Sequence, residues 1–146
     1  MFKIIKNEEL LTAIKPISNK YANIDNPYEL YDILNGLWSK DTCAPRLRDK
    51  WSDDNKTVGQ CSITAFLAQD IFGGEVYGVE IGDGNYHCFN KVGECIFDLT
   101  SEQFKEDLNY TLDNKQCRLT HFNKKEKEER YNLLKDKLDL YLNRNC

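Results

Sequence analysis

Residues 59–74, GQCSITAFLAQDIFGG, predict a helix that begins at a cysteine. Its apolar residues recur at the spacing of one helix face: Ile63, Phe66, Leu67 and Ile71. The pair Gly73-Gly74 follows the run as a helix stop. A cysteine in the first turn lies among unpaired N–H groups and at the positive end of the helix dipole, and both favour the reactive thiolate. Cys61 is therefore a candidate nucleophile.

Size and composition indicate a single domain over residues 1–146. Hydrophobic residues make up 40% and charged residues 30%, as in ordinary soluble proteins. A net charge of −4 gives no reason to expect nucleic acid or an anionic membrane as a partner. We find no signal peptide and no run of about 18 apolar residues, so we expect a cytoplasmic protein without a membrane span.

The cysteines follow no metal-binding pattern. They are six in number, at positions 43, 61, 88, 95, 117 and 146. An even count indicates a disulfide framework in short secreted chains, whereas in reducing cytoplasm we expect mostly buried, free thiols. Because the sequence lacks a CxxC pair, we expect neither a metal nor another cofactor.

Upstream of Cys61, the sequence predicts two helices and a long loop. Residues 7–14 form the first helix, and the second begins with Asn26 as its cap. Residues 39–58 have no period, and a loop of that length in a small domain is often functional. This loop is a candidate substrate wall with Trp38 and Trp51 as aromatic liners; packing of both tryptophans in or at the core is the equal alternative.

Downstream, the period changes from that of a helix to that of a strand. Three antiparallel strands are predicted as a meander: residues 75–81, 86–90 and 95–99. A helix from Thr100 to about Leu108 and a short strand at 116–121 follow. Residues 124–142 predict a final helix whose charged start, KKEKEE at 124–129, is typical of a solvated surface.

The hairpin supplies partners for the cysteine. If residues 91–94, or only 92 and 93, form its turn, His87 lies directly opposite Asp98, with Cβ atoms about 4.5–5.5 Å apart. His87 then takes the proton of Cys61, and Asp98 orients the imidazole. Alternatively, His87 is a core histidine and Asp98 bonds backbone amides near Thr100. His121 has no such partner, and we expect it to be structural or exposed.

A nucleophile of this kind also needs donors for an oxyanion. The Cys61 backbone N–H is one, because first-turn amides are unpaired in a helix. Gln60 is a candidate second donor by residue type and proximity. Such a site forms a thioester with an amide or ester substrate, which water or an amine then resolves.

Cysteine on a helix, followed by histidine and aspartate on neighbouring strands, resembles the core of papain-like and transglutaminase-like cysteine enzymes. At motif level the chain is similar to the small bacterial YunG-type proteins. The similar pieces are Trp38 with Thr42, GQC at 59–61 with Thr64 and Ala65, QDIFGGEV at 69–76, His87 with Asn90, and DLTSEQF at 98–104. The resemblance implies an α+β fold in which a central cysteine helix packs on an antiparallel sheet between flanking N- and C-terminal helices.

We interpret the sequence as a cysteine-dependent hydrolase or acyltransferase, amidase- or peptidase-like, acting on a small-molecule or peptide amide or ester through Cys61, His87 and Asp98. The alternative is a non-catalytic module on the same fold that binds a peptide or protein. A third reading, redox sensing through Cys61 with Cys88 or Cys95, needs these thiols to be adjacent.

Overall fold

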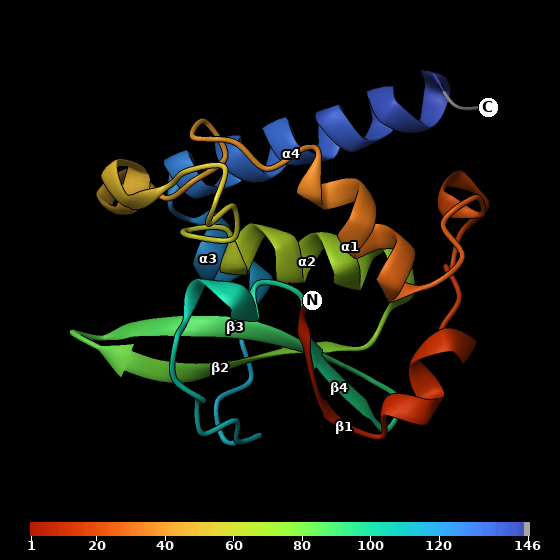
Figure 1. Cartoon of the computed structure of the whole chain (residues 1–146), viewed down its shortest axis with the longest axis horizontal. Helices are drawn as coiled ribbons and strands as arrows, with labels where there is room; N and C mark the ends of the chain where they lie inside the picture. The colour runs from red at the N-terminus through yellow and green to blue at the C-terminus, as the bar shows by residue number, and fades with distance from the viewer. Residues whose placement is uncertain (145–146) are drawn as a thin grey trace.

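A computed structural model describes residues 1–144. It is an α+β structure with a four-stranded antiparallel sheet in the order β1-β4-β3-β2 (Figure 1). The strands are β1 (Lys3–Lys6), β2 (Glu75–Gly82), β3 (Asn85–Val92) and β4 (Cys95–Asp98). The α-helices are α1 (Pro27–Asn35), α2 (Cys61–Phe72), α3 (Arg118–Phe122) and α4 (Lys125–Arg144). The 3-10 helices are η1 (Glu8–Ala13), η2 (Asn19–Tyr21), η3 (Pro45–Lys50) and η4 (Ser101–Gln103).

Helix α2 lies at the centre, between the sheet and the helices α1 and α4 (Figure 1). The predicted helix is confirmed from Cys61 to Phe72, and it ends at Gly73, whose φ of 80° favours glycine. Most of its residues are buried, because both of its faces pack. This burial fixes the position of Cys61 at its start.

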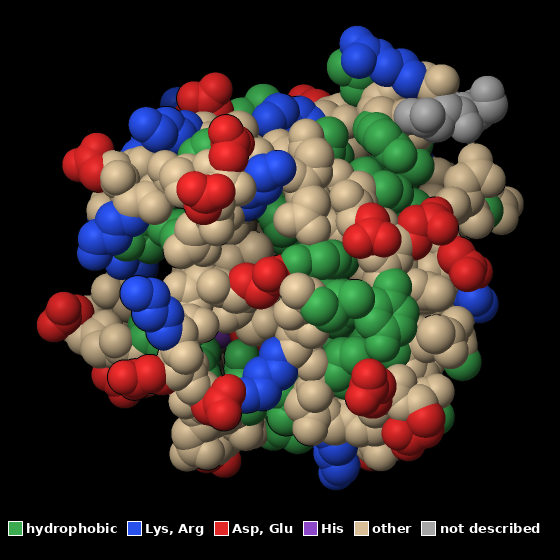
Figure 2. Space-filling view, in the orientation of Figure 1, with side chains coloured by type: hydrophobic (Ala, Val, Ile, Leu, Met, Phe, Trp, Pro, Cys, Tyr) green, Lys and Arg blue, Asp and Glu red, His purple; other side chains and the backbone are tan. Residues whose placement is uncertain are grey.

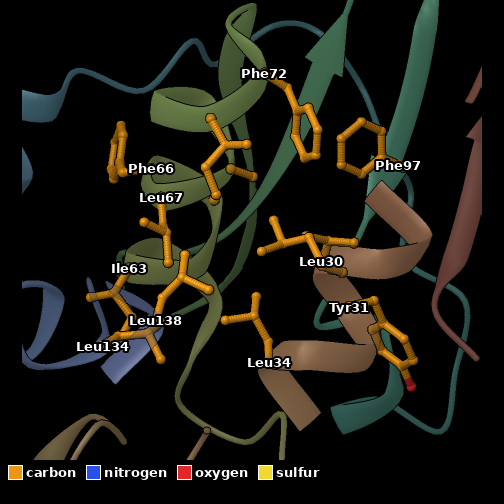
Figure 3. Packing of buried hydrophobic residues seen from close by; sticks show 14 of the residues in the cluster. Leu30, Tyr31, Leu34, Ile63, Phe66, Leu67, Phe72, Phe97, Leu134 and Leu138 are labelled. Atoms are coloured by element: carbon orange, nitrogen blue, oxygen red, sulfur yellow. The ribbon is translucent and has the colours of Figure 1, made fainter. Parts of the chain in front are cut away.

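The main core fills the space between the helices. In Figure 3, side chains from α1, α2 and α4 point toward one another, with Phe97 from β4 beside them. Leu30, Leu34, Leu134 and Leu138 are fully buried in this cluster. Helix α1 begins as predicted, since the Asn26 side chain accepts hydrogen bonds from the amides of Tyr28 and Glu29. The buried residues of these helices therefore form one common core.

The predicted meander β2-β3-β4 is confirmed, but its register differs from the prediction. Gly93 and Glu94 form the β3-β4 turn, with Gly93 at a φ of 58°, so Val92 pairs with Cys95 and Asn90 with Phe97. His87 is therefore not directly opposite Asp98 but diagonal to it. A shift by two residues keeps both side chains on the same face of the sheet.

The face of the sheet away from α2 carries a second cluster, made by Val79, Phe89 and Ile96 with Tyr77, Ile5, Leu108 and Tyr110 against it. The helix predicted from Thr100 to Leu108 is wrong beyond η4: residues 104–117 run irregularly across this face. The strand predicted at 116–121 is also wrong. Gln116 N–H donates to the Val76 carbonyl at the edge of β2, and α3 follows at once.

The N-terminal segment differs from prediction in two ways. Strand β1 joins the sheet beside β4, and the helix expected at 7–14 is the 3-10 helix η1. Asn7 adopts a left-handed conformation, and its side chain donates to the Glu94 carbonyl at 2.7 Å instead of capping η1. The loop at 39–58 contains η3. No helix in the described chain has both the length and the apolar character needed to cross a bilayer.

Candidate active site

A pocket of about 840 Å³ opens where the start of α2 meets the β2-β3 hairpin, the η3 loop and the segment from α3 to α4. Cys61 and His87 both line it. Figure 2 shows a hollow on one face of the molecule in which a histidine is visible. The candidate nucleophile and base thus border the same cavity.

The sulfur of Cys61 is half-buried at the N-terminal end of α2 and lies 3.9 Å from the Tyr86 carbonyl oxygen on β3. The first intrahelical hydrogen bond runs from Thr64 N–H to the Gln60 carbonyl at 3.1 Å. The amides of Cys61, Ser62 and Ile63 therefore have no partner within the helix. They supply the positive end of the helix dipole directly at the thiol.

Gly59 fixes the backbone conformation of the loop that precedes Cys61. Its φ is 71°, and a Cβ there would lie 2.5 Å from the Cys43 sulfur and 2.8 Å from the Ala44 nitrogen. The Gly59 carbonyl accepts from Ala44 N–H at 3.0 Å and from the buried guanidinium of Arg130 at 3.4 Å. Only glycine fits this close approach.

The imidazole of His87 is fully buried, and Nε2 lies 2.6 Å from Asp98 Oδ2. The same carboxylate oxygen accepts from the Tyr110 hydroxyl at 2.6 Å, and Oδ1 accepts from Thr100 N–H at 3.1 Å. Asp98 thus bonds both the imidazole and a backbone amide near Thr100, so the contact expected of it in each reading is present. The Phe104 ring meets the imidazole edge to face, with centroids 4.6 Å apart.

The other ring nitrogen, Nδ1, is buried and has no hydrogen-bond partner within residues 1–144. Burial alone would lower the pKa of His87, but the Asp98 carboxylate outweighs it and raises that pKa to about 10. The pKa of the Cys61 thiol is well below its ordinary value, because the neighbouring Cys88 thiol and then the His87 ring stabilise the thiolate. Both shifts favour the charged forms, a thiolate on Cys61 and an imidazolium on His87.

The remaining predicted site residues do not face the pocket. Trp38 packs in the core, where its Nε1 donates to Thr64 Oγ1 at 3.0 Å. Trp51 donates to the Lys56 carbonyl at 2.9 Å and is not among the lining residues. Gln60 is fully buried and its amide donates to the Ser39 carbonyl at 3.1 Å. Trp38 and Trp51 thus make the packing contacts that the sequence offered as the alternative, and none of the three residues lines the pocket.

Residues 26–143 match the sequence profile of the family described as "YunG protein". The chain belongs to the YunG family. The "Uncharacterized protein YunG" of Bacillus subtilis (strain 168) is 33% identical over 78 residues, which are 53% of this chain and 63% of that protein. The match thus spans less than two thirds of the relative. No solved structure matches the chain significantly.

In this member of the YunG family, a second histidine also lines the pocket. His121, which the sequence led us to treat as structural or exposed, is half-buried: its Nε2 lies 2.8 Å from Gln116 Oε1, and its Nδ1 lies 2.9 Å from Lys127 Nζ. Burial, and then the charge of Lys127, lower the pKa of His121 to about 4. The ring is therefore neutral at pH 7.

Among the cysteines that the structure describes, Cys88 is the one that interacts with Cys61. Cys95 lies in the core on β4, and Cys43 and Cys117 lie elsewhere; all five are free thiols, while Cys146 lies outside the described residues. Within the described range, no three His, Cys, Asp or Glu side chains are grouped to hold a metal ion. Tyr110, which donates to Asp98, lies outside the motifs quoted from the sequence, so only the fold identifies it.

Proposed function

We propose that this chain is a cysteine-dependent hydrolase or acyltransferase that acts on an amide or ester through Cys61, His87 and Asp98, on a core similar to that of papain-like and transglutaminase-like enzymes. The observation that carries the proposal is the state of His87. One ring nitrogen is held by a buried carboxylate and the other is buried and unpartnered, while Cys61 lines the same pocket and interacts electrostatically with the ring. A buried polar atom without a partner is uncommon and calls for an explanation.

The reaction follows from these positions. The Cys61 thiolate attacks the substrate carbonyl carbon, and the carbonyl π electrons move to oxygen. The unpaired amides of the first turn of α2 are donors for the resulting oxyanion. The tetrahedral intermediate collapses to a thioester as the amine or alcohol departs with the proton of His87 Nδ1. His87 then takes a proton from water or an acceptor amine, which attacks the thioester and returns Cys61.

Asp98 is the orienting group in this scheme. Its hydrogen bond fixes the imidazole with Nδ1 toward Cys61, and its charge stabilises the imidazolium. Tyr110 and Thr100 occupy both carboxylate oxygens and hold them in place. The alternative, a non-catalytic binding module, gives no reason for a buried imidazolium next to a thiolate.

A simple acyl donor tests the proposal without knowledge of the natural substrate. Incubation with p-nitrophenyl acetate should transfer an acetyl group to Cys61, detected by mass spectrometry of the digested protein, with a burst of nitrophenol. The exposed Cys117, whose pKa is lowered by backbone amides near Thr120, is a demanding internal reference. Cys61→Ser should abolish the burst. Acetylation of Cys61 no faster than that of Cys117 would favour the non-catalytic module.

A further inference from the structure

The wall of the pocket is cationic, although the chain as a whole carries a net charge of −4. Five basic side chains line the pocket: Arg46, Lys50, Lys124, Lys127 and Arg130. Glu126 is the one carboxylate among the described lining residues, and Arg130 Nε donates to it at 2.8 Å. The other four basic residues form no ion pair within the described part of the chain. The pocket wall is therefore positive, in contrast to the net negative charge of the chain.

Lys127 differs from the other three because it is half-buried, whereas Arg46, Lys50 and Lys124 are exposed at the rim. Exposed charges are largely screened by solvent and salt. A half-buried ammonium without a carboxylate has a desolvation cost, which the charges of the Cys88 and Cys61 sulfurs offset only in part. Burial accordingly lowers the pKa of Lys127. A bound anion would offset that cost.

The ammonium of Lys127 is held in place by a chain of contacts. Because His121 is neutral at pH 7, with its Nε2–H donating to Gln116 Oε1, its Nδ1 accepts from Lys127. The Gln116 side chain lies against Gly78, where a Cβ would come within 2.8 Å of its amide nitrogen. An ammonium has three donors, and this arrangement uses one; Lys127 Nζ makes no other hydrogen bond within residues 1–144.

We propose that the substrate of the Cys61 site carries an anionic group, a carboxylate or a phosphate, which binds Lys127 in the wall of the same pocket. The inference rests on the proposed function and names its substrate class. The anionic group docks on Lys127, with the rim residues Arg46, Lys50 and Lys124 attracting it over a longer range. The acyl carbon then lies at Cys61. A lysine is a point charge, so its contact suits either anion.

Two alkylating reagents that differ in charge test this inference. Iodoacetate and iodoacetamide transfer their group to a thiolate with loss of iodide, and only iodoacetate is an anion. At each cysteine, the rate with iodoacetate is divided by the rate with iodoacetamide, and the value at Cys61 is compared with that at Cys117. The value at Cys61 should be roughly tenfold higher at low salt. This preference should decline as salt is added. Lys127→Gln should remove most of the preference, Lys127→Arg should retain it, and the rim variant Lys124→Gln should reduce it only slightly.

The outcomes separate the inference from the proposed function. Fast labelling of Cys61 by both reagents with no preference for iodoacetate overturns the anionic substrate and leaves the nucleophile intact. Labelling of Cys61 no faster than Cys117 by either reagent overturns both. If Lys127→Gln does not fold, the salt dependence of the iodoacetate preference in the unmodified protein tests the inference. Protection of Cys61 from iodoacetamide by acetate supports a carboxylate, protection by inorganic phosphate supports a phosphate, and protection by neither contradicts the inference.

Discussion

His87 meets different groups at its two ring nitrogens, and this asymmetry defines the candidate site. Nε2 lies 2.6 Å from a carboxylate that is itself held by Tyr110 and Thr100, while Nδ1 is buried without a partner. In a neutral histidine held in this way, Nδ1 is an acceptor for the Cys61 thiol. A protonated one can donate from it to the thiolate of Cys61. The chemistry proposed for the site depends on that proton.

The pKa values of the two histidines of the chain should be shifted in opposite directions from that of a free histidine. His87, whose pKa is raised to about 10, should stay protonated through neutral pH, and His121, whose pKa is lowered to about 4, should stay neutral. NMR of the imidazole Cε1 protons, assigned with His87→Ala, measures both. Because the pKa of His87 is raised by folding, its stabilising contribution is complete below about pH 6.5 and is lost as pH rises through about 10. Titration of His87 near 6.5 would contradict the ion pair.

The charge of Asp98 matters more than any single hydrogen bond to it. Asp98→Asn keeps the shape but removes the carboxylate, so the pKa of His87 should fall, that of Cys61 should rise, and iodoacetamide alkylation of Cys61 at pH 7 should slow by roughly tenfold or more. Tyr110→Phe, the matched control, removes one hydroxyl and keeps the charge. It should slow alkylation less than about threefold. Equal effects of the two changes would show that Asp98 acts by packing alone.

The sequence identifies Cys61, His87 and Asp98 as candidates because each lies on a regular element with a readable period. The predicted register was off by two residues, and the pairing still left His87 and Asp98 on one face, since strand side chains alternate with a period of two. Tyr110 and Phe104 lie in the irregular segment after η4. Nothing local indicates where such a segment runs.

At the scale of elements, α4 stabilises the molecule through one buried stripe against α2 (Figure 3). Leu134 on this stripe is 0% exposed, and its neighbour Leu133 is 37% exposed. Leu134→Ala should lower the free energy of unfolding by about 2–5 kcal/mol, since it leaves a cavity. Leu133→Ala should change it by less than about 1 kcal/mol. Urea unfolding measures both, and equal losses would refute this packing of α4.

Arg130 connects α4 to the loop that presents Cys61. Its guanidinium donates to the carbonyls of Thr42 and Gly59 at 3.0 and 3.4 Å and to Glu126. Arg130→Gln should therefore destabilise the protein by about 1.5–3 kcal/mol and slow the alkylation of Cys61. Arg144→Gln, at the exposed end of the same helix, is the control and should change neither quantity. Unaltered stability and alkylation in Arg130→Gln would refute the connection.

The long helices and the meander were predictable, whereas β1 and α3 were not. Helices α1, α2 and α4 have apolar stripes, caps or stops that act locally. Strand β1 has four residues and α3 has five, too few to show a period. Helix α3 depends on tertiary contacts: Arg118 donates to both oxygens of Asp70 on α2 and lies over the Phe66 ring. Tertiary contacts of this kind override local propensity.

At the scale of the whole molecule, the pocket unites segments that are distant in the sequence: η3, the start of α2, the β2-β3 hairpin and the segment from α3 to α4. The charged run at 124–129 suggested only a solvated helix start, yet Lys124 and Lys127 line the pocket. Charge on a helix shows which residues are polar, and only the fold shows what they face. The cationic wall of the pocket was therefore not readable from the sequence.

The central claim is that His87 holds Cys61 as a thiolate at neutral pH. The pH dependence of iodoacetamide alkylation at Cys61, followed by mass spectrometry in the unmodified protein and in His87→Gln, tests it most directly. We predict a half-maximal rate well below the ordinary thiol pKa of about 8.5 in the unmodified protein, and a shift to higher pH in the variant. A Cys61 that titrates near 8.5 in both proteins would contradict the claim.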